Sequence, residues 1–336
     1  MRNNFYLIGI LTILLGSPIA ESCSVAFWND NPQAKVIGRT MDVNFDDMPL
    51  MVVTPRDVER HGETEENPLK WKTRYGSVAI TMFHTGAVND GINEQGFTAQ
   101  LLYLDQSDYG KLDPKKSGLS IAYLAQYMLD NFKTVDEALK SLDTYQVRLA
   151  ENAGKIAPLH LAIQDSTGDS AVVEFIAGKA VIHHGKEYNV MTNEPVYSKQ
   201  LSNLKKYKLF GGNLAMPGDA DPLSRFVRLS SYMKTLPTPK NEIDAVTGML
   251  SVIRTVMVPF GAEDTSGFEA TVDAWPTRWI TLTDLTHKTY YFSSTSAPNI
   301  VWVDLDKLQF TPGSPVLQLD PRDISLQGDV SAQLKR

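Results

Sequence analysis

Cys23 is the only cysteine in this chain of 336 residues, and it directly follows a segment with the features of a secretion signal. If the chain is cleaved after Ser22, Cys23 becomes the first residue and carries both a thiol and a free α-amine. An α-amine has a pKa of about 7.7–8.0, so it can exchange a proton with the thiol near neutral pH without a histidine. This combination favours attack on an amide carbonyl by an N-terminal nucleophile.

Residues 1–22 are predicted to be a signal peptide. Arg2 precedes an apolar run over residues 5–15, and the small-residue pattern Ala20-Glu21-Ser22 ends the segment. The apolar run is too short to span a bilayer. We therefore expect a periplasmic or secreted protein whose mature part, residues 23–336, forms one domain, because no repeat, low-complexity tract or linker divides it.

Cys23 could also have a role without catalysis. An unpaired thiol can be a leftover, although its coincidence with the predicted cleavage site would then be chance. A cysteine after a signal can also be a lipid anchor, which makes a lipid-anchored, non-catalytic binding protein the rival from another class. Bacterial lipoprotein signals prefer Leu three residues before the cysteine and Gly or Ala directly before it, whereas this chain has Ala20 and Ser22. Acylation of the amine would also remove the base.

Composition describes an ordinary globular protein. Hydrophobic residues make up 43% and charged residues 21% of the chain, and the formal net charge is −7. This acidic balance argues against nucleic acid or an anionic membrane as a partner. No metal-binding or nucleotide-binding motif is present, and the adjacent His183 and His184 would point to opposite faces of a strand. We therefore expect neither a metal nor a cofactor.

The order of the predicted elements indicates layers. Strand patterns occupy residues 23–28, 35–42, 51–55, 77–82, 97–104, 160–164, 171–176, 180–182, 188–192, 279–283 and 288–292. Helical patterns occupy 121–132, a segment starting with a capping box at Thr134, 222–235 and 241–257. Separate blocks of strands and helices predict two sheets packed between helices, an α+β fold, rather than alternating units of a parallel sheet.

The segment Gly38-Arg39-Thr40-Met41-Asp42 lies on the predicted second strand, one hairpin away from Cys23. Arg39 would favour the thiolate form of Cys23 electrostatically, and Asp42 would anchor the amine. The two side chains have opposite parity on a regular strand, so both face Cys23 only if the chain bends at Met41 or Asp42. From spacing alone, a surface ion pair is the other interpretation.

Five segments together resemble the choloylglycine hydrolase family, which contains bile salt hydrolases and penicillin V acylases. They are Cys23, Gly38-Arg39-Thr40-Met41-Asp42, Asp90-Gly91-Ile92-Asn93-Glu94-Gln95-Gly96-Phe97, Met191-Thr192-Asn193-Glu194-Pro195 and Ser224-Arg225-Phe226. Their order and spacing are compatible with the family over almost all of the mature chain. The resemblance implies a four-layer αββα Ntn-hydrolase sandwich that hydrolyses a linear amide C–N bond through a thioester acyl-enzyme, without a cofactor.

The same resemblance assigns roles to individual residues. Cys23 matches the family nucleophile, Arg39 the arginine beside it and Asp42 the aspartate that holds the α-amine. Asn193, in the Thr-Asn-x-Pro segment, matches the oxyanion asparagine. Arg225, in Ser-Arg-Phe, matches a further active-site arginine.

The second oxyanion position falls on Tyr103. Many bile salt hydrolases have asparagine there, whereas penicillin V acylases often have tyrosine. Because a backbone N–H can serve with either side chain, we expect Tyr103 to affect substrate preference, with its ring lining the acyl pocket.

The resemblance implies a substrate with a bulky apolar acyl part and a small polar amine part. Conjugated bile salts, phenoxyacetyl penicillin and acyl-homoserine lactones have this form, so an acyl-homoserine lactone acylase of the same fold is an alternative. A secretion signal and a short connection between Asn193 and Arg225 are typical of the Gram-negative branch. Val43 stands where relatives often place tryptophan, which changes an expected pocket wall. A homo-oligomer, either a dimer or a tetramer, is compatible with the resemblance.

Overall fold

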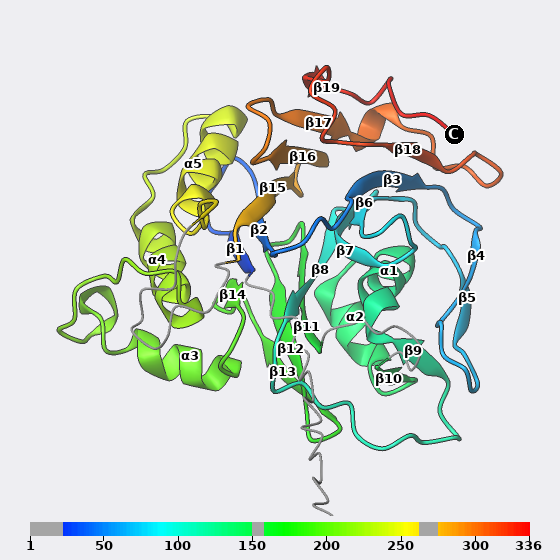
Figure 1. Cartoon of the computed structure of the whole chain (residues 1–336), viewed down its shortest axis with the longest axis horizontal. Coiled ribbons are helices and arrows are strands. Elements are labelled where there is room, and N and C mark those ends of the chain that lie inside the picture. The colour runs from blue at the N-terminus through cyan, green and yellow to red at the C-terminus, as the bar shows by residue number, and fades with distance from the viewer. Residues whose placement is uncertain (1–22, 150–157, 262–274) are drawn as a thin grey trace, which may run out of the picture.

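The computed structural model describes residues 23–149, 158–261 and 275–336, so the predicted signal peptide lies outside the described residues. Two large sheets form the centre of the molecule (Figure 1). In spatial order, the first sheet contains β14 (Val190–Thr192), β1 (Ser24–Trp28), β2 (Val36–Asp42), β15 (Thr277–Asp284), β16 (Thr289–Ser294), β17 (Val301–Asp304) and β19 (Gly328–Asp329). The second contains β13 (Lys179–His184), β12 (Ser170–Ile176), β11 (Leu159–Asp165), β8 (Phe97–Tyr103), β7 (Val88–Asn93), β6 (Ser77–Thr81), β3 (Leu50–Thr54) and β18 (Leu317–Leu319).

Helices cover one face of each sheet (Figure 1). The helices are α1 (Ile121–Asn131), α2 (Val135–Ser141), α3 (Tyr197–Leu204), α4 (Pro222–Thr235) and α5 (Glu242–Arg254), with short 3-10 helices η1 (Lys208–Phe210) and η2 (Leu305–Lys307). Two small strand pairs are β4 (Glu59–His61) with β5 (Lys70–Lys72), and β9 (Gly118–Ser120) with β10 (Gln146–Arg148). α1 and α2 pack on the second sheet, whereas α4 and α5 pack on the first. This order of layers confirms the predicted αββα architecture.

Side-chain caps begin two of the predicted helices. Thr134 accepts a hydrogen bond from the N–H of Glu137 at the start of α2, and Asp221 caps α4 with Pro222 at its first position. The helix predicted to continue to residue 257 ends at Arg254, because β-branched residues and then Pro259 disfavour further helix. None of the helices in the described part of the chain is long and apolar enough to cross a membrane.

The two faces of β2 meet different layers. A Cβ on Gly38 would lie 3.0 Å from Sδ of Met249 and 3.1 Å from Cβ of Ile253, so this face of β2 packs directly on α5. Strand alternation then turns Arg39 and Met41 towards the second sheet. β2 therefore supplies side chains to the layer between the sheets and to the layer under α4 and α5.

The β2–β15 ladder is irregular where β2 ends. Thr277 pairs with Asp42 and Trp279 pairs with Met41, so Arg278 is an additional residue on β15. This is a β-bulge, which increases the local twist and re-aims side chains. A bend in β2 was predicted at Met41 or Asp42, and the irregularity lies at these residues. The extra residue, however, belongs to β15.

Candidate active site

Cys23 directly precedes β1 and is fully buried. Its Sγ lies 3.7 Å from Sδ of Met41 on the neighbouring strand. Its main-chain nitrogen donates a hydrogen bond to Oδ1 of Asn193 at 2.6 Å. The predicted nucleophile and the predicted oxyanion residue therefore meet, although 170 positions separate them in the sequence.

Arg39 and Asp42 lie on opposite faces of the first sheet. Arg39 lies on the inter-sheet face, and its Nη2 is 3.4 Å from Sδ of Met41, the atom that contacts the thiol. Asp42 lies on the other face with Thr40, whose hydroxyl donates to Oδ2 of Asp42 at 3.1 Å. The expected bend that would turn both side chains to one face is therefore not needed. Both residues are fully buried, which excludes the surface ion pair.

Arg39 is held between the sheets by a carbonyl and an aromatic ring. Its Nη2 donates to the carbonyl of Leu101 on β8 at 3.2 Å, and its guanidinium carbon lies 4.7 Å from the centre of the Trp279 ring. These contacts fix a buried positive charge on the face that also carries the thiol. The expected effect of Arg39 on the thiol stays a prediction, with Sδ of Met41 as the atom that both groups contact.

The carboxylate of Asp42 accepts hydrogen bonds on both oxygens. Thr277 donates to Oδ1 at 2.6 Å and Thr40 donates to Oδ2, while Nη1 of Arg225 lies 3.9 Å from Oδ2. Burial raises the pKa of Asp42 to about 7, although Arg225 and the two threonines oppose this shift.

Arg225 connects the first turn of α4 to the start of β1. Its Nη1 donates to the carbonyl of Cys23 at 2.7 Å and to the hydroxyl of Ser24 at 2.6 Å, and its Nη2 donates to Oδ1 of Asn193 at 3.0 Å. Burial lowers the pKa of Arg225, and the nearby Asp42 carboxylate opposes that shift. Asp42 therefore reaches Cys23 through this guanidinium.

The amide of Asn193 has one possible orientation. A guanidinium can only donate hydrogen bonds, so the Asn193 atom that faces Arg225 must be the oxygen. Nδ2 then donates one of its two hydrogens to the carbonyl of Tyr103 at 2.9 Å. Gln200 holds the segment in place by donating to the carbonyl of Asn193 at 2.6 Å and by accepting a bond from Thr192.

Tyr103 contributes its main chain to the Cys23 cluster, which consists of Cys23, Arg39, Asp42, Asn193, Arg225 and their hydrogen-bond partners. Its ring is 4% exposed and belongs to the apolar core under α1 and α2, and its hydroxyl donates to Asp105 at 3.1 Å. The strand face explains this placement, because Leu101 and Tyr103 alternate with Leu102, which faces the other sheet. The expectation that the ring lines an acyl pocket is therefore not supported by its position.

Thr277, Trp279 and Gln200 belong to the cluster but were not predicted. Thr277 and Trp279 approach β2 only through the β2–β15 pairing, which no local sequence pattern reveals. Only the spacing could have indicated Gln200, because it follows Asn193 by the short connection to α3 and the first turn of that helix.

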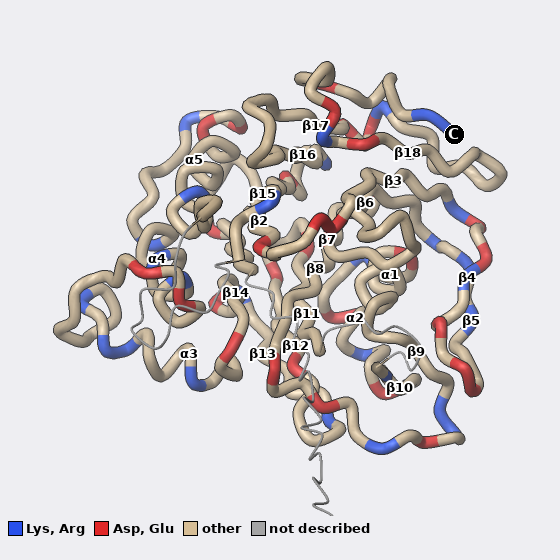
Figure 2. The backbone as a smooth tube through the Cα atoms, viewed as in Figure 1, with Lys and Arg blue, Asp and Glu red and all other residues tan. Residues whose placement is uncertain are grey.

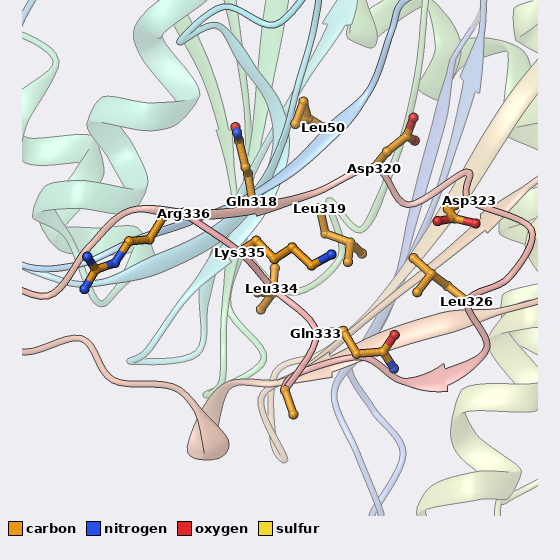
Figure 3. Close-up of a pocket in the computed structure, with 11 residues that line it drawn as sticks. Leu50, Gln318, Leu319, Asp320, Asp323, Leu326, Gln333, Leu334, Lys335 and Arg336 are labelled. Carbon is orange, nitrogen blue, oxygen red and sulfur yellow. The ribbon is translucent and has the colours of Figure 1, made fainter.

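Two cavities of the described structure lie away from the Cys23 cluster. One, of about 620 Å³, lies in the C-terminal part and is lined by residues such as Leu50, Gln318, Leu334 and Lys335 (Figure 3). The other, of about 650 Å³, is lined by residues such as Thr64, Tyr109, Arg148 and Pro158. None of the six predicted site residues lines either cavity.

One group of side chains in the described residues has donor atoms close enough to hold a metal ion. Glu242, Asp284 and His287 place one donor atom each within 4.8 Å of one another. Asp284 already accepts the main-chain N–H groups of Thr286 and His287 and contacts Nδ1 of His287 at 2.7 Å, as in an Asx turn. The turn accounts for the group, which shares no residue with the Cys23 cluster.

Asp42 is expected to make stability fall as pH rises. Its pKa is about 7 in the folded protein, whereas the ordinary value of 3.8 applies in the unfolded chain, which therefore loses this proton first. This contribution is complete below about pH 4 and is lost as pH rises through 7, with a size on the order of a few kcal/mol. Asp42→Asn removes the titration, so we expect the free energy of unfolding of the variant to rise relative to wild type between pH 5 and pH 8. Urea unfolding across this range measures it.

The matched control for this measurement is Asp30→Asn. Asp30 is exposed, so this variant should differ from wild type by a constant amount across the same pH range. A parallel pH dependence for wild type and Asp42→Asn would contradict the assigned titration.

Comparison with known proteins identifies the family. The model described as linear amide C–N hydrolases, choloylglycine hydrolase family, matches residues 23–323. The penicillin V acylase of Pectobacterium atrosepticum is 37% identical over 339 residues, which cover 93% of this chain and 89% of that protein. The bile salt hydrolase/transferase of Clostridium perfringens is 26% identical over 237 residues, which cover 63% of this chain and 71% of that protein.

Solved structures share the architecture. The penicillin V acylase of Agrobacterium tumefaciens superposes with a TM-score of 0.83 at 37% identity, covering 93% of this chain and 97% of that one. A mutant conjugated bile acid hydrolase of Clostridium perfringens gives a TM-score of 0.73 at 22% identity, which shows the fold alone. This chain is therefore a hydrolase of linear amide bonds that belongs to the choloylglycine hydrolase family, with the α+β sandwich of an Ntn hydrolase.

Proposed function

We propose that the protein is a periplasmic or secreted amidase of the penicillin V acylase type, in which Cys23 is the N-terminal nucleophile. The observation that carries this proposal is the convergence of Asn193 and Arg225 on the main chain of Cys23. The family match also begins at Cys23, the residue that cleavage after Ser22 would make the terminus. In the mature chain the Cys23 nitrogen, which is hydrogen-bonded to Asn193, is then the free α-amine.

In the proposed first step, the α-amine of Cys23 accepts the thiol proton while Sγ attacks the carbonyl carbon of the amide. Asn193 Oδ1 accepts an N–H of the amine, which directs the amine's lone pair away from Asn193. Arg39 favours the thiolate from the inter-sheet face, and Arg225 with Asp42 holds the terminus from the other face. The C–S bond forms, and the carbonyl oxygen becomes an oxyanion.

The oxyanion needs preorganised donors. Nδ2 of Asn193 has a second hydrogen beyond the one given to the carbonyl of Tyr103, and we assign it to the oxyanion. The backbone N–H of Tyr103 is the proposed second donor. The C–N bond then breaks, the α-ammonium protonates the leaving amine, and a thioester remains. Water, deprotonated by the same amine, releases the acid and regenerates the thiol.

Two observations favour an aromatic acyl group. The relative named penicillin V acylase shares 37% identity over 93% of the chain, whereas the bile salt hydrolase of Clostridium perfringens shares 26% over 63%. Three residues after Asp42, the partly buried ring of Phe45 stacks on Phe83 with ring centres 5.6 Å apart. Both rings pack against the core layer that includes Cys23, and we assign the aryl group of the substrate to this pair, where it would bind by offset stacking.

The lipid-anchor alternative fits the site poorly. The main-chain nitrogen of Cys23 is buried and donates to Oδ1 of Asn193 at 2.6 Å, and acylation of this nitrogen would remove the proposed base. The proposed partner is a small amide with an amphipathic acyl group, and a homo-oligomer stays a prediction.

The N-terminus of the mature protein tests the proposal. We expect active protein purified from the secreting host to begin at Cys23 with an unmodified amine and thiol. Protein expressed with residues 1–22 retained should fold but hydrolyse no amide, because its Cys23 nitrogen is a peptide nitrogen without basicity. Intact-mass analysis and Edman sequencing measure the terminus. Full activity with residues retained before Cys23, or a lipid adduct on active protein, would refute this mechanism.

A panel of three amides tests the substrate class. We expect kcat/KM to be highest for phenoxyacetyl penicillin. The values for a glycine-conjugated bile salt and for a long-chain acyl-homoserine lactone should both be lower. Phe45→Leu should reduce kcat/KM for the phenoxyacetyl substrate more than for the lactone, because stacking is lost while apolar volume is kept. A clear preference for the lactone would favour the acyl-homoserine lactone acylase.

A further inference from the structure

Between α3 and α4 the chain leaves the body of the molecule and forms a projection of residues 205–218 (Figure 1, yellow-green, at left). Lys205, Lys206 and Lys208 on the projection are exposed, as is Lys199 on the adjacent α3. No Asp or Glu occurs between Glu194 and Asp219 in the sequence. Figure 2 shows these basic positions along α3 and the projection. The projection is therefore a basic region on a chain whose net charge is −7.

Apolar side chains stand exposed among these lysines. Leu209, Leu214 and Met216 keep 45%, 47% and 44% of their surface accessible. Phe210, the last residue of η1, packs under Lys234 of α4, whose Nζ lies 5.2 Å from the ring centre. An exposed apolar group rimmed by polar residues marks an interaction surface.

The projection is ordered by its own hydrogen bonds. The N–H groups of Gly212 and Leu214 donate to the carbonyls of Tyr207 and Lys206 at 3.0 Å, and Lys208 N donates to the Leu214 carbonyl at 3.0 Å. Lys234 Nζ also donates to the carbonyl of Leu209 at 3.0 Å. The apolar side chains are thus presented on a fixed scaffold.

We propose that the projection docks the protein on an anionic lipid surface. Apolar side chains among lysines are the features of a segment that lies in the membrane interface, where the side chains enter the acyl boundary and the lysines meet lipid phosphates. The net charge argued against such a partner. Exposed charges more than about 8 Å apart are largely screened at physiological ionic strength, so the local lysines decide the contact.

The charge pattern favours lipid over a second copy of the chain. A twofold contact would place this surface against itself and bring lysines opposite lysines, which is unfavourable. The acidic residues nearest in sequence, Asp219 and Asp221, are exposed where the chain returns to α4, beyond Pro217.

The projection is also joined to the site. Arg228 of α4 donates to the carbonyl of Pro217 in the projection at 3.3 Å, and Nε of Arg225 donates at 2.9 Å to the carbonyl of Ala220, which follows the projection. Docking would therefore bring the Arg225 end of α4 close to a surface into which amphipathic amides partition. Lipid binding itself does not depend on the proposed substrate.

Co-sedimentation of the mature protein with lipid vesicles tests the proposal. We expect more than about tenfold stronger binding to phosphatidylcholine vesicles containing phosphatidylglycerol than to pure phosphatidylcholine. The triple variant Lys205→Glu, Lys206→Glu, Lys208→Glu should lose more than about tenfold of this binding. Replacing Leu209, Leu214 and Met216 together by Ser should also weaken vesicle binding. This loss should persist at high salt, because it comes from apolar contacts.

The matched control reverses three exposed lysines elsewhere, in Lys111→Glu, Lys115→Glu, Lys116→Glu, with the same change in net charge. This control should bind as wild type does, and all variants should hydrolyse a soluble amide at the wild-type rate. Absence of wild-type binding to the anionic vesicles would overturn the proposal, as would an equal loss in the control. A wild-type dimer that the projection variants dissociate, without vesicle binding, would assign the surface to a second copy.

Discussion

Cys23→Ala is expected to abolish amide hydrolysis. The proposed mechanism needs the sulfur as nucleophile, and no other cysteine in the chain can replace it. Cys23→Ser should leave little activity, because a hydroxyl is far harder to deprotonate by an amine with a pKa of about 8. Initial rates of phenoxyacetyl penicillin hydrolysis at high enzyme concentration measure both variants.

The single cysteine also provides a direct control. Iodoacetamide should modify wild-type protein once, at Cys23, and hydrolysis should be lost in proportion to the modified fraction found by mass spectrometry. Thermal unfolding of Cys23→Ser should remain close to that of wild type, since the side chains have similar size. Substantial turnover by the alanine variant, or by fully alkylated wild type, would refute the role of Cys23.

The layers of the fold were predictable because they follow from the order of local patterns. Apolar spacing places α1, the capping box at Thr134 places α2, and the helical pattern over 222–235 places α4. The prediction missed helix α3, the interior strands β7 and β17 and the edge strand β18, because short segments such as the three residues of β18 carry too little periodicity. The main chain of such strands finds its partners only through the tertiary structure, as β18 does on β3.

The composition of the site was predictable by motif, but its geometry was not. Strand parity correctly predicted that Arg39 and Asp42 face opposite sides of the sheet. It also led us to expect a bend that the structure does not need, because the sequence does not reveal that Arg225 of α4 lies on the Asp42 side and contacts Cys23. Thr277 lies 235 positions from Asp42 and meets it through the β2–β15 register, including the bulge at Arg278. The sequence likewise did not reveal that the Tyr103 side chain points from β8 into the core under α1 and α2.

Asn193→Ala is expected to lower kcat by roughly 10²–10³-fold, as removal of one preorganised oxyanion donor typically does. The proposal assigns Asn193 two functions, because Oδ1 accepts a hydrogen bond from the Cys23 nitrogen and Nδ2 is the proposed donor to the oxyanion. Alkylation separates them, because iodoacetamide reacts with the thiolate without forming an oxyanion. We therefore expect the alkylation rate of Asn193→Ala to fall less than about tenfold, much less than kcat.

Two variants control for structural effects of the Asn193 substitution. Asn189→Ala removes an amide that donates to the carbonyl of Phe27 at 3.2 Å, next to β14 but outside the cluster, and should leave kcat within about twofold of wild type. Tyr103→Phe keeps the carbonyl and N–H that the proposed oxyanion site uses, and should also change kcat little. Equal losses of hydrolysis and alkylation in Asn193→Ala would show that Asn193 only positions the amine, and the oxyanion donor would then have to lie elsewhere.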